Sequence, residues 1–179
     1  MVQLIELIGN KKLASLIVFF LRHPTKKIHQ QDIKKEVKIA KATLIKWLNM
    51  LARQGFIEFT EYGRTKIYSL KRENIIIKQL KMLDNLLLIS GIKTIAEKHD
   101  SAAYLFGSAA RGEDAEDSDI DILLIGKVNR EDIIRDINKI SEKIKRNINL
   151  QIFSPMEWSQ MAKKDAAFYE RVEKDKAEL

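Results

Sequence analysis

The chain has 179 residues, of which 45% are apolar and 32% charged, a balance typical of folded globular domains and not of disordered chains. It has no cysteine, which excludes disulfides and thiolate metal sites and fits a reducing compartment. Its longest apolar run, residues 13–21, is far shorter than the ~20 residues that cross a bilayer, and no signal peptide is visible, so we expect a cytoplasmic protein without membrane contact.

Charge is divided unevenly along the chain. Residues 1–72 carry 15 Lys and Arg against 5 Asp and Glu, whereas residues 73–179 carry 17 against 20. A shift of this kind is typical of a domain boundary, and the basic half is expected to have a polyanionic partner. A lysine-rich surface that only faces solvent is the alternative, and charge alone does not decide between them.

Apolar spacing predicts three helices in the basic half. The first follows Asn10 as N-cap and ends before Pro24, because the residue before proline avoids the helical region. The second is predicted over 30–37, and the third runs from about 41 to 54 and is closed by Gly55 in the left-handed conformation. Two strands are then predicted around Gly63-Arg64 as a hairpin, at 57–62 and 65–70.

This order of elements, over about residues 11–70, resembles the winged-helix DNA-binding domains of prokaryotic transcription regulators. The most family-like segment runs from Leu44 to Ile57, a recognition helix leading into the wing. One departure is Ala40, where such helices often begin with serine or threonine as N-cap. The resemblance implies double-stranded DNA as partner, with protein binding or self-association as the alternative.

The expected recognition helix carries polar residues suited to DNA. Asn49 can pair with adenine, and Lys46 and Arg53 can contact guanine or phosphate. Lys41 and Thr43 lie near the N-terminal end, which usually meets base edges. Further basic residues are predicted to contact phosphates of the DNA backbone and so fix the position of the domain on DNA: Lys34, Lys35, Lys38, Arg64 and Lys66.

Residues 73–99 form an unusually apolar helical segment. Apolar side chains occur on more than one face, so the segment must be buried on several sides. We expect a connecting helix to about Asp84 or Asn85, then a second helix ending near Lys98. The excess apolar surface suits a two-fold homodimer, or equally the packing of both domains on this segment within one chain. The predicted division is therefore 1–72, 73–85 and 86–179.

Strands and helices alternate in the last part of the chain, which predicts a small mixed sheet flanked by helices. The expected fold class is thus α+β, a winged helix-turn-helix followed by an α/β domain. Strands are predicted at 102–106, 120–125 and 147–153. A short helix is expected after residue 107, further helices at 130–145 and from Pro155, and a last short helix at 165–174.

The most specific motif begins directly after the first of these strands, where residues 107–112 read Gly-Ser-Ala-Ala-Arg-Gly. A strand-to-helix turn leaves backbone N–H groups free to bind an anion. Gly107 allows phosphate to approach the backbone, Ser108 adds a hydroxyl donor and Arg111 can bind a phosphate oxygen. Gly112 is expected to close the turn. The segment therefore predicts a phosphate cradle.

Asp119 and Asp121 stand on either side of Ile120 at the start of the next strand. Alternate residues of a strand face the same side, so the two carboxylates should converge while Ile120 and Ile122 face the core. Converging carboxylates repel, and a divalent cation removes that cost; Mg²⁺ takes one or two carboxylates together with phosphate oxygens. Phosphate and metal together predict a nucleoside triphosphate site, whereas an isolated acidic pair would be a solvated strand end.

Residues 105–112 and 118–123 closely resemble the motif of minimal nucleotidyltransferase domains, within the superfamily related to DNA polymerase beta. The resemblance extends over about residues 86–161. It implies nucleotidyl transfer by a two-metal mechanism, with Asp119 and Asp121 as catalytic carboxylates that hold Mg²⁺, or alternatively Mn²⁺. It also implies a bound triphosphate near these residues: Gly107, Ser108, Arg111, Gly112 and Ser118.

The chain departs from the family on the next strand, where active members place a third carboxylate. Residues 147–153 contain no acid, and Asn149 stands at the aligned position. A neutral amide lacks the charge that attracts the catalytic ion and cannot accept the hydroxyl proton. Glu157 could replace it only with a different local geometry. Nucleotide binding is therefore expected to survive better than catalysis.

Three functions follow from these patterns. The first is a DNA-binding transcription regulator whose transferase-like domain binds Mg-nucleotide. The second is an active nucleotidyltransferase, acting on a protein or small molecule, with the winged helix for targeting. The third is an antitoxin-type partner of a toxin, since free-standing minimal transferase domains often act in that way. The missing third carboxylate favours the first over the second.

Overall fold

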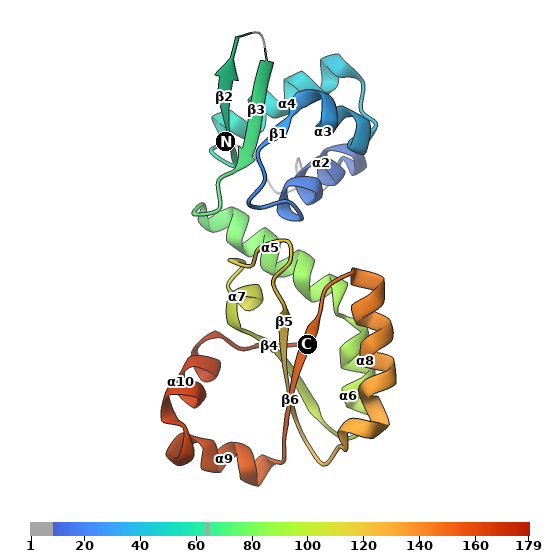
Figure 1. Cartoon of the computed structure of the whole chain (residues 1–179), viewed down its shortest axis with the longest axis vertical. Helices are drawn as coiled ribbons and strands as arrows, with labels where there is room; N and C mark the ends of the chain where they lie inside the picture. The colour runs from blue at the N-terminus through green and yellow to red at the C-terminus, as the bar shows by residue number, and fades with distance from the viewer. Residues whose placement is uncertain (1–8, 64) are drawn as a thin grey trace. The chain divides into compact units, whose positions relative to one another are not determined.

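The computed structural model describes residues 9–63 and 65–179 (Figure 1). The chain divides into two compact units, Met1–Leu80 and Lys81–Leu179, and the division falls inside helix α5 (Ile75–Leu88). Arg64, a predicted DNA contact, lies outside the described residues. Within them, no helix is both long and apolar enough to cross a membrane.

Three helices of the first unit begin and end close to the predicted residues. In α2 (Lys11–Leu21) the Asn10 side chain accepts hydrogen bonds from the first-turn N–H groups of Lys12 and Leu13, both at 3.1 Å, so the predicted N-cap is confirmed. Helix α3 covers Gln30–Val37 and α4 covers Lys41–Arg53. After α4, Gly55 adopts a φ of +72°, the left-handed conformation expected of a C-terminal cap.

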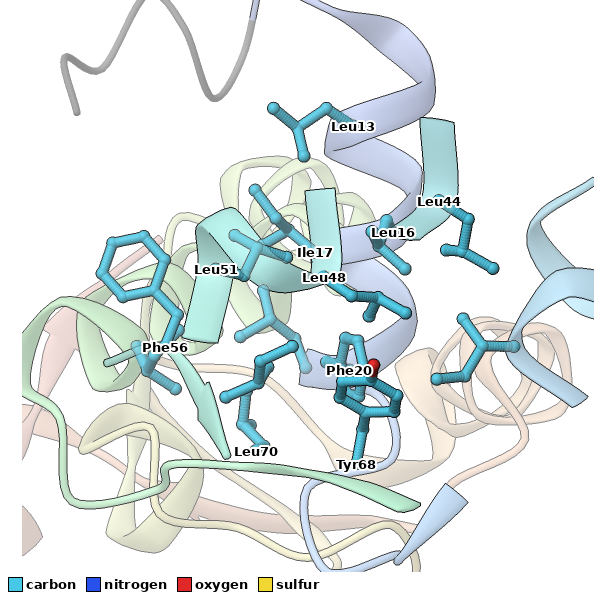
Figure 2. Packing of buried hydrophobic residues seen from close by; sticks show 14 of the residues in the cluster. Leu13, Leu16, Ile17, Phe20, Leu44, Leu48, Leu51, Phe56, Tyr68 and Leu70 are labelled. Carbon is cyan, nitrogen blue, oxygen red and sulfur yellow. The ribbon is translucent and has the colours of Figure 1, made fainter. Parts of the chain in front are cut away.

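The wing is a three-stranded antiparallel sheet in the order β1-β3-β2. Strands β2 (Ile57–Tyr62) and β3 (Thr65–Leu70) are the predicted hairpin. Strand β1 (Ile28–His29) was not predicted, because two residues are too few to show alternation. Figure 2 shows the core that joins sheet and helices, in which Tyr68 of β3 packs with the apolar stripes of α2 and α4: Leu16, Phe20, Leu44, Leu48 and Leu51.

The second unit contains a four-stranded mixed sheet in the order β6-β5-β4-β7. Strands β5 (Ile120–Ile125) and β6 (Ile148–Phe153) run parallel, while β4 (Ala102–Phe106) pairs antiparallel with β5 and with β7 (Ala177–Glu178). The predicted mixed sheet is confirmed. Strand β7 was not expected, since its two residues follow a helical pattern.

Helices cover both faces of this sheet (Figure 1). Helices α6 (Gly91–Lys98) and α8 (Arg130–Ile144) pack against one face of the sheet, where they contact Leu105, Ile122 and Leu150. Helices α9 (Pro155–Lys164) and α10 (Ala166–Asp175) pack with the opposite face, through Trp158 and Val172. The alternation along β5 thus assigns even-numbered residues to the α6/α8 side and odd-numbered residues to the α9/α10 side.

Helix α5 does not end at Asp84 or Asn85 as predicted. It continues to Leu88, and α6 begins at Gly91. The reason is that Asn85 is not a helix terminator here: its side chain is buried and donates to the carbonyl of Ala109 at 3.0 Å. The predicted end of α6 near Lys98 is correct.

Candidate nucleotide site and DNA-binding surface

Gly107 lies where β4 ends and the four-residue helix α7 (Gly107–Ala110) begins. Its φ is +73°, a conformation that L side chains rarely adopt. A Cβ at this position would also stand 2.6 Å from Oδ2 of Asp121, well inside contact distance. The turn therefore requires glycine for two separate reasons, and the backbone of the predicted phosphate cradle lies directly against the carboxylate predicted to bind metal.

Asp121 and Asn149 are register partners on the parallel strands β5 and β6. The Asn149 amide donates a hydrogen bond from Nδ2 to Oδ1 of Asp121 at 2.8 Å. The structure therefore places Asn149 directly beside the acidic pair, at the position where the sequence aligned it with a third carboxylate. In place of that charge, Asp121 has an amide donor.

Asp119 immediately precedes β5 and is exposed, whereas Asp121 is half-buried. Ile120 and Ile122 are fully buried on the α6/α8 side, so the two aspartates belong to the opposite side of the strand. In the described part of the chain, no group of three or more His, Cys, Asp or Glu side chains is arranged to hold a metal ion. The donor set is thus two carboxylates and an amide, which fits one Mg²⁺ completed by phosphate oxygens and water.

Arg111, predicted to bind a phosphate oxygen, already has two acidic partners. Its Nε donates to Oε2 of Glu113 at 2.8 Å, and its Nη1 donates to Oδ2 of Asp175 at the end of α10. The hydrogen bonds from Arg111 to Glu113 and then to Asp175 raise the pKa of the guanidinium. Both carboxylates therefore compete with a phosphate for the Arg111 guanidinium, which keeps further N–H donors beside these two contacts.

Gly112 and Ser118 shape the loop between α7 and β5. Gly112 is buried and has a φ of +65°, as expected of a residue that closes the turn. The Ser118 hydroxyl accepts a hydrogen bond from the Ala115 N–H at 2.9 Å. Its role in the structure is to hold the loop. Ser108, in the first turn of α7, is half-buried.

Four residues that the sequence analysis missed form a buried polar cluster beneath this loop: Lys81, Asn85, Asp114 and Arg146. Asp114 Oδ2 lies 2.8 Å from Arg146 Nη1 and 3.1 Å from Lys81 Nζ. Burial, opposed by the nearby Asp114 carboxylate, lowers the pKa of Lys81. A signal was present in the sequence, because Lys81 and Asn85 are spaced by one helical turn and so share one face of α5.

The predicted recognition helix presents its basic side chains to solvent. Lys41, Lys46 and Arg53 are exposed on α4, while Thr43 and Asn49 are half-buried on the same helix. Ala40 makes no side-chain hydrogen bond to the first turn, as expected. All five predicted α4 contacts thus retain some access to solvent.

The remaining predicted phosphate contacts differ in their surroundings. Lys34 and Lys35 line a hollow of about 380 Å³, together with Lys41, Gln30 and Gln31. Lys35 Nζ lies 3.5 Å from Asp32, an exposed ion pair that DNA phosphate could replace. Lys66 is more strongly engaged, since its Nζ lies 3.1 Å from Glu61 and 4.1 Å from the centre of the Phe59 ring.

Comparison with known families agrees with both units. The family model described as a nucleotidyltransferase domain matches residues 88–172, and the one described as the TBPIP/Hop2 winged helix domain matches residues 22–71. The chain therefore consists of an N-terminal winged helix domain and a C-terminal nucleotidyltransferase domain.

A solved structure from Sulfolobus solfataricus, inferred to be a nucleotidyltransferase, is 26% identical to this chain. The match covers 56% of this chain and 84% of that one, with a TM-score of 0.32. No curated protein matches the sequence.

Proposed function

We propose that this protein is a DNA-binding transcription regulator whose nucleotidyltransferase domain binds a Mg²⁺–nucleoside triphosphate with little or no turnover. The winged helix domain would bind double-stranded DNA, and the second domain would act as the nucleotide sensor. Gly107 and Ser108 would hold the triphosphate, and Asp119 and Asp121 would hold the ion.

The observation that carries this proposal is the hydrogen bond from Asn149 to Asp121 at 2.8 Å. A second catalytic ion needs negative charge at this point, and the attacking hydroxyl needs an acceptor for its proton. The Asn149 amide supplies neither. When bound, one Mg²⁺ would still neutralise phosphate charge between Asp119 and Asp121, so nucleotide binding would be retained without transfer.

DNA binding is supported by charge and by the winged helix together. Residues 1–72 carry three times as many basic as acidic side chains, with 15 against 5. Lys41, Lys46 and Arg53 are exposed on the helix that would enter the major groove. Lys34 and Lys35 extend the basic surface onto α3, where they would contact phosphates.

The proposal is tested by incubating the full-length protein with Mg²⁺ and α-labelled ATP, measuring bound and covalently transferred label separately. We expect bound label without transfer. Asp119→Ala should remove the bound label, and Asn149→Asp should be the variant in which transfer first appears. Transfer by the unmodified protein that Asp119→Ala abolishes would instead establish an active nucleotidyltransferase.

We also propose that the protein is a homodimer, in keeping with the two-fold reading of DNA by helix-turn-helix proteins. The second unit supports this with two large apolar side chains on α5, Leu83 at 51% and Leu87 at 66% exposure. Sedimentation analysis should give a dimer that Leu83→Ser/Leu87→Ser converts to monomer. If the unmodified protein is a monomer, the homodimer proposal is wrong, and the Leu83/Leu87 patch would instead bind a different protein, such as a toxin.

A further inference from the structure

The second unit buries its charged and polar side chains in one place. Lys81, Asn85 and Asp114 are 5%, 2% and 1% exposed, and they are the buried polar residues of the described chain. All three lie in one cluster with the Arg146 guanidinium. Removing charges from water is costly, and well-packed apolar residues of similar size are often at least as stabilising. Stability alone is therefore a poor reason for this cluster.

The cluster holds the loop that joins the two halves of the nucleotide site. Asn85 Nδ2 donates both to the Ala109 carbonyl at 3.0 Å and to Asp114 Oδ1 at 2.9 Å. Arg146 donates to the Ser118 carbonyl from Nε at 2.9 Å and from Nη2 at 2.7 Å. The loop is thus fixed at its start, at its middle and at the residue before Asp119.

These contacts come from rigid elements outside the motif. Lys81 and Asn85 belong to α5, and Arg146 follows the left-handed cap of α8 at Lys145. The described residues between α7 and β5 form no regular secondary structure that could set the path of the backbone. The pairing of Phe106 with Asp121 sets the sheet side of the site. The side chains of the cluster hold the loop on its other side, as far as Ser118, the residue before Asp119.

We propose that Asp114, held by Lys81, Asn85 and Arg146, is a positioning residue that fixes Asp119 relative to the phosphate cradle. The inference rests on the proposed binding of a Mg²⁺–nucleotide. Outer partners of metal ligands typically change metal affinity or activity by about 10–100-fold when they are removed. Asp114 would act in this way through the loop backbone, without touching the nucleotide.

The test compares Asp114→Asn with Asp117→Asn, which removes the same charge from an exposed position in the same loop. Amide hydrogen exchange of the full-length protein without nucleotide should rise at least tenfold over residues 112–119 in Asp114→Asn only. The affinity for Mg²⁺ and a non-hydrolysable ATP analogue, measured by calorimetry, should fall about 10–100-fold in the same variant.

Arg146→Lys provides a second variant in case Asp114→Asn does not fold. Lysine keeps a positive charge for Asp114 but cannot make the double contact with the Ser118 carbonyl. We expect a nearly unchanged melting temperature with at least a tenfold loss of analogue affinity. A merely structural cluster would instead make affinity follow melting temperature in every variant, and that result would overturn the inference.

The two proposals fail in different ways. If the unmodified protein does not bind the analogue, the proposed function is wrong, and loop exchange still decides whether Asp114 sets the loop. If the unmodified protein binds, but Asp114→Asn matches Asp117→Asn in both exchange and affinity, the positioning role is wrong and nucleotide binding stands.

Discussion

A side chain on Gly107 would place its Cβ 2.6 Å from Oδ2 of Asp121. The phosphate cradle and the metal-binding carboxylate proposed for this site thus share one contact, made possible by the absence of a side chain. A change at position 107 must therefore act on both halves of the site.

Gly107→Ala should weaken the site and the fold together. The left-handed conformation costs a non-glycine residue about 1–2 kcal/mol, and the Cβ would push the Asp121 carboxylate away. Gly63→Ala is the matched control, because Gly63 also has a positive φ but a Cβ there meets nothing within 4 Å. Denaturant unfolding should show a larger loss of stability for Gly107→Ala. Equal losses, with nucleotide affinity unchanged, would contradict the proposed contact.

Mg²⁺ and an ATP analogue should stabilise the protein only when they are present together. At an analogue concentration 100 times its Kd, the free energy of unfolding of the binding unit should rise by about 2.7 kcal/mol. EDTA should remove this gain, and Asp121→Asn should prevent it, whereas the exposed Asp117→Asn should leave it intact. Calorimetric melting checks each case, and stabilisation that survives EDTA would exclude a metal-dependent site.

Releasing Arg111 should strengthen triphosphate binding. Asp175→Asn removes one of its two carboxylate partners while keeping the size of the side chain. Partly exposed ion pairs contribute about 0.2–1 kcal/mol, so the affinity gain should be at most about fivefold. Asp136→Asn is the control, since Asp136 pairs with Lys139 on α8. Weaker binding in Asp175→Asn would mean that this ion pair orients Arg111 for phosphate and does not compete with it.

DNA affinity should depend on the exposed basic face of α4. Lys46→Ala/Arg53→Ala should reduce the slope of log affinity against log salt concentration by about 2, because each substitution leaves one DNA phosphate without its cation. Lys12→Ala/Lys71→Ala removes the same charge from exposed positions outside α4. Fluorescence anisotropy with a duplex over a salt series measures both slopes. Identical slopes in the two double variants would indicate that net charge alone, without a docked α4, determines binding.

Local patterns were enough to predict most elements of the fold. Leu44, Leu48 and Leu51 are spaced for one face of a helix, and all three are buried in α4. Ile120 and Ile122 alternate with Asp121, and burial follows that alternation at the start of β5, before helices on both faces bury Ile122, Leu123 and Leu124 alike. Such periodicity needs no knowledge of the rest of the chain. Strands β1 and β7 were missed because each has two residues and is defined by its partner strand.

The sequence predicted the motif residues of the candidate site but not the buried polar cluster that holds its loop. Gly107, Asp121 and Asn149 were identified because their residue types and spacing carry chemical meaning. The buried cluster depends on contacts between distant positions, such as Asn85 with Asp114 across 29 residues and with Arg146 across 61. The helix was consequently expected to end at about Asp84 or Asn85, because the spacing of Lys81 and Asn85 marks a shared helix face without identifying the distant partners of Asn85.

The hydrogen bond from Asn149 also has a consequence for ion selectivity. Oδ1 of Asp121 already accepts that amide, so an incoming cation would be bound mainly through the other oxygen. Ca²⁺ favours six to eight oxygen ligands and readily takes both oxygens of one carboxylate, whereas Mg²⁺ binds in a strict octahedron with one oxygen from each ligand and retains water. In the proposed site, a carboxylate with one oxygen already hydrogen-bonded to Asn149 would therefore favour Mg²⁺ over Ca²⁺, so the amide that replaces a charge would also narrow the choice of metal.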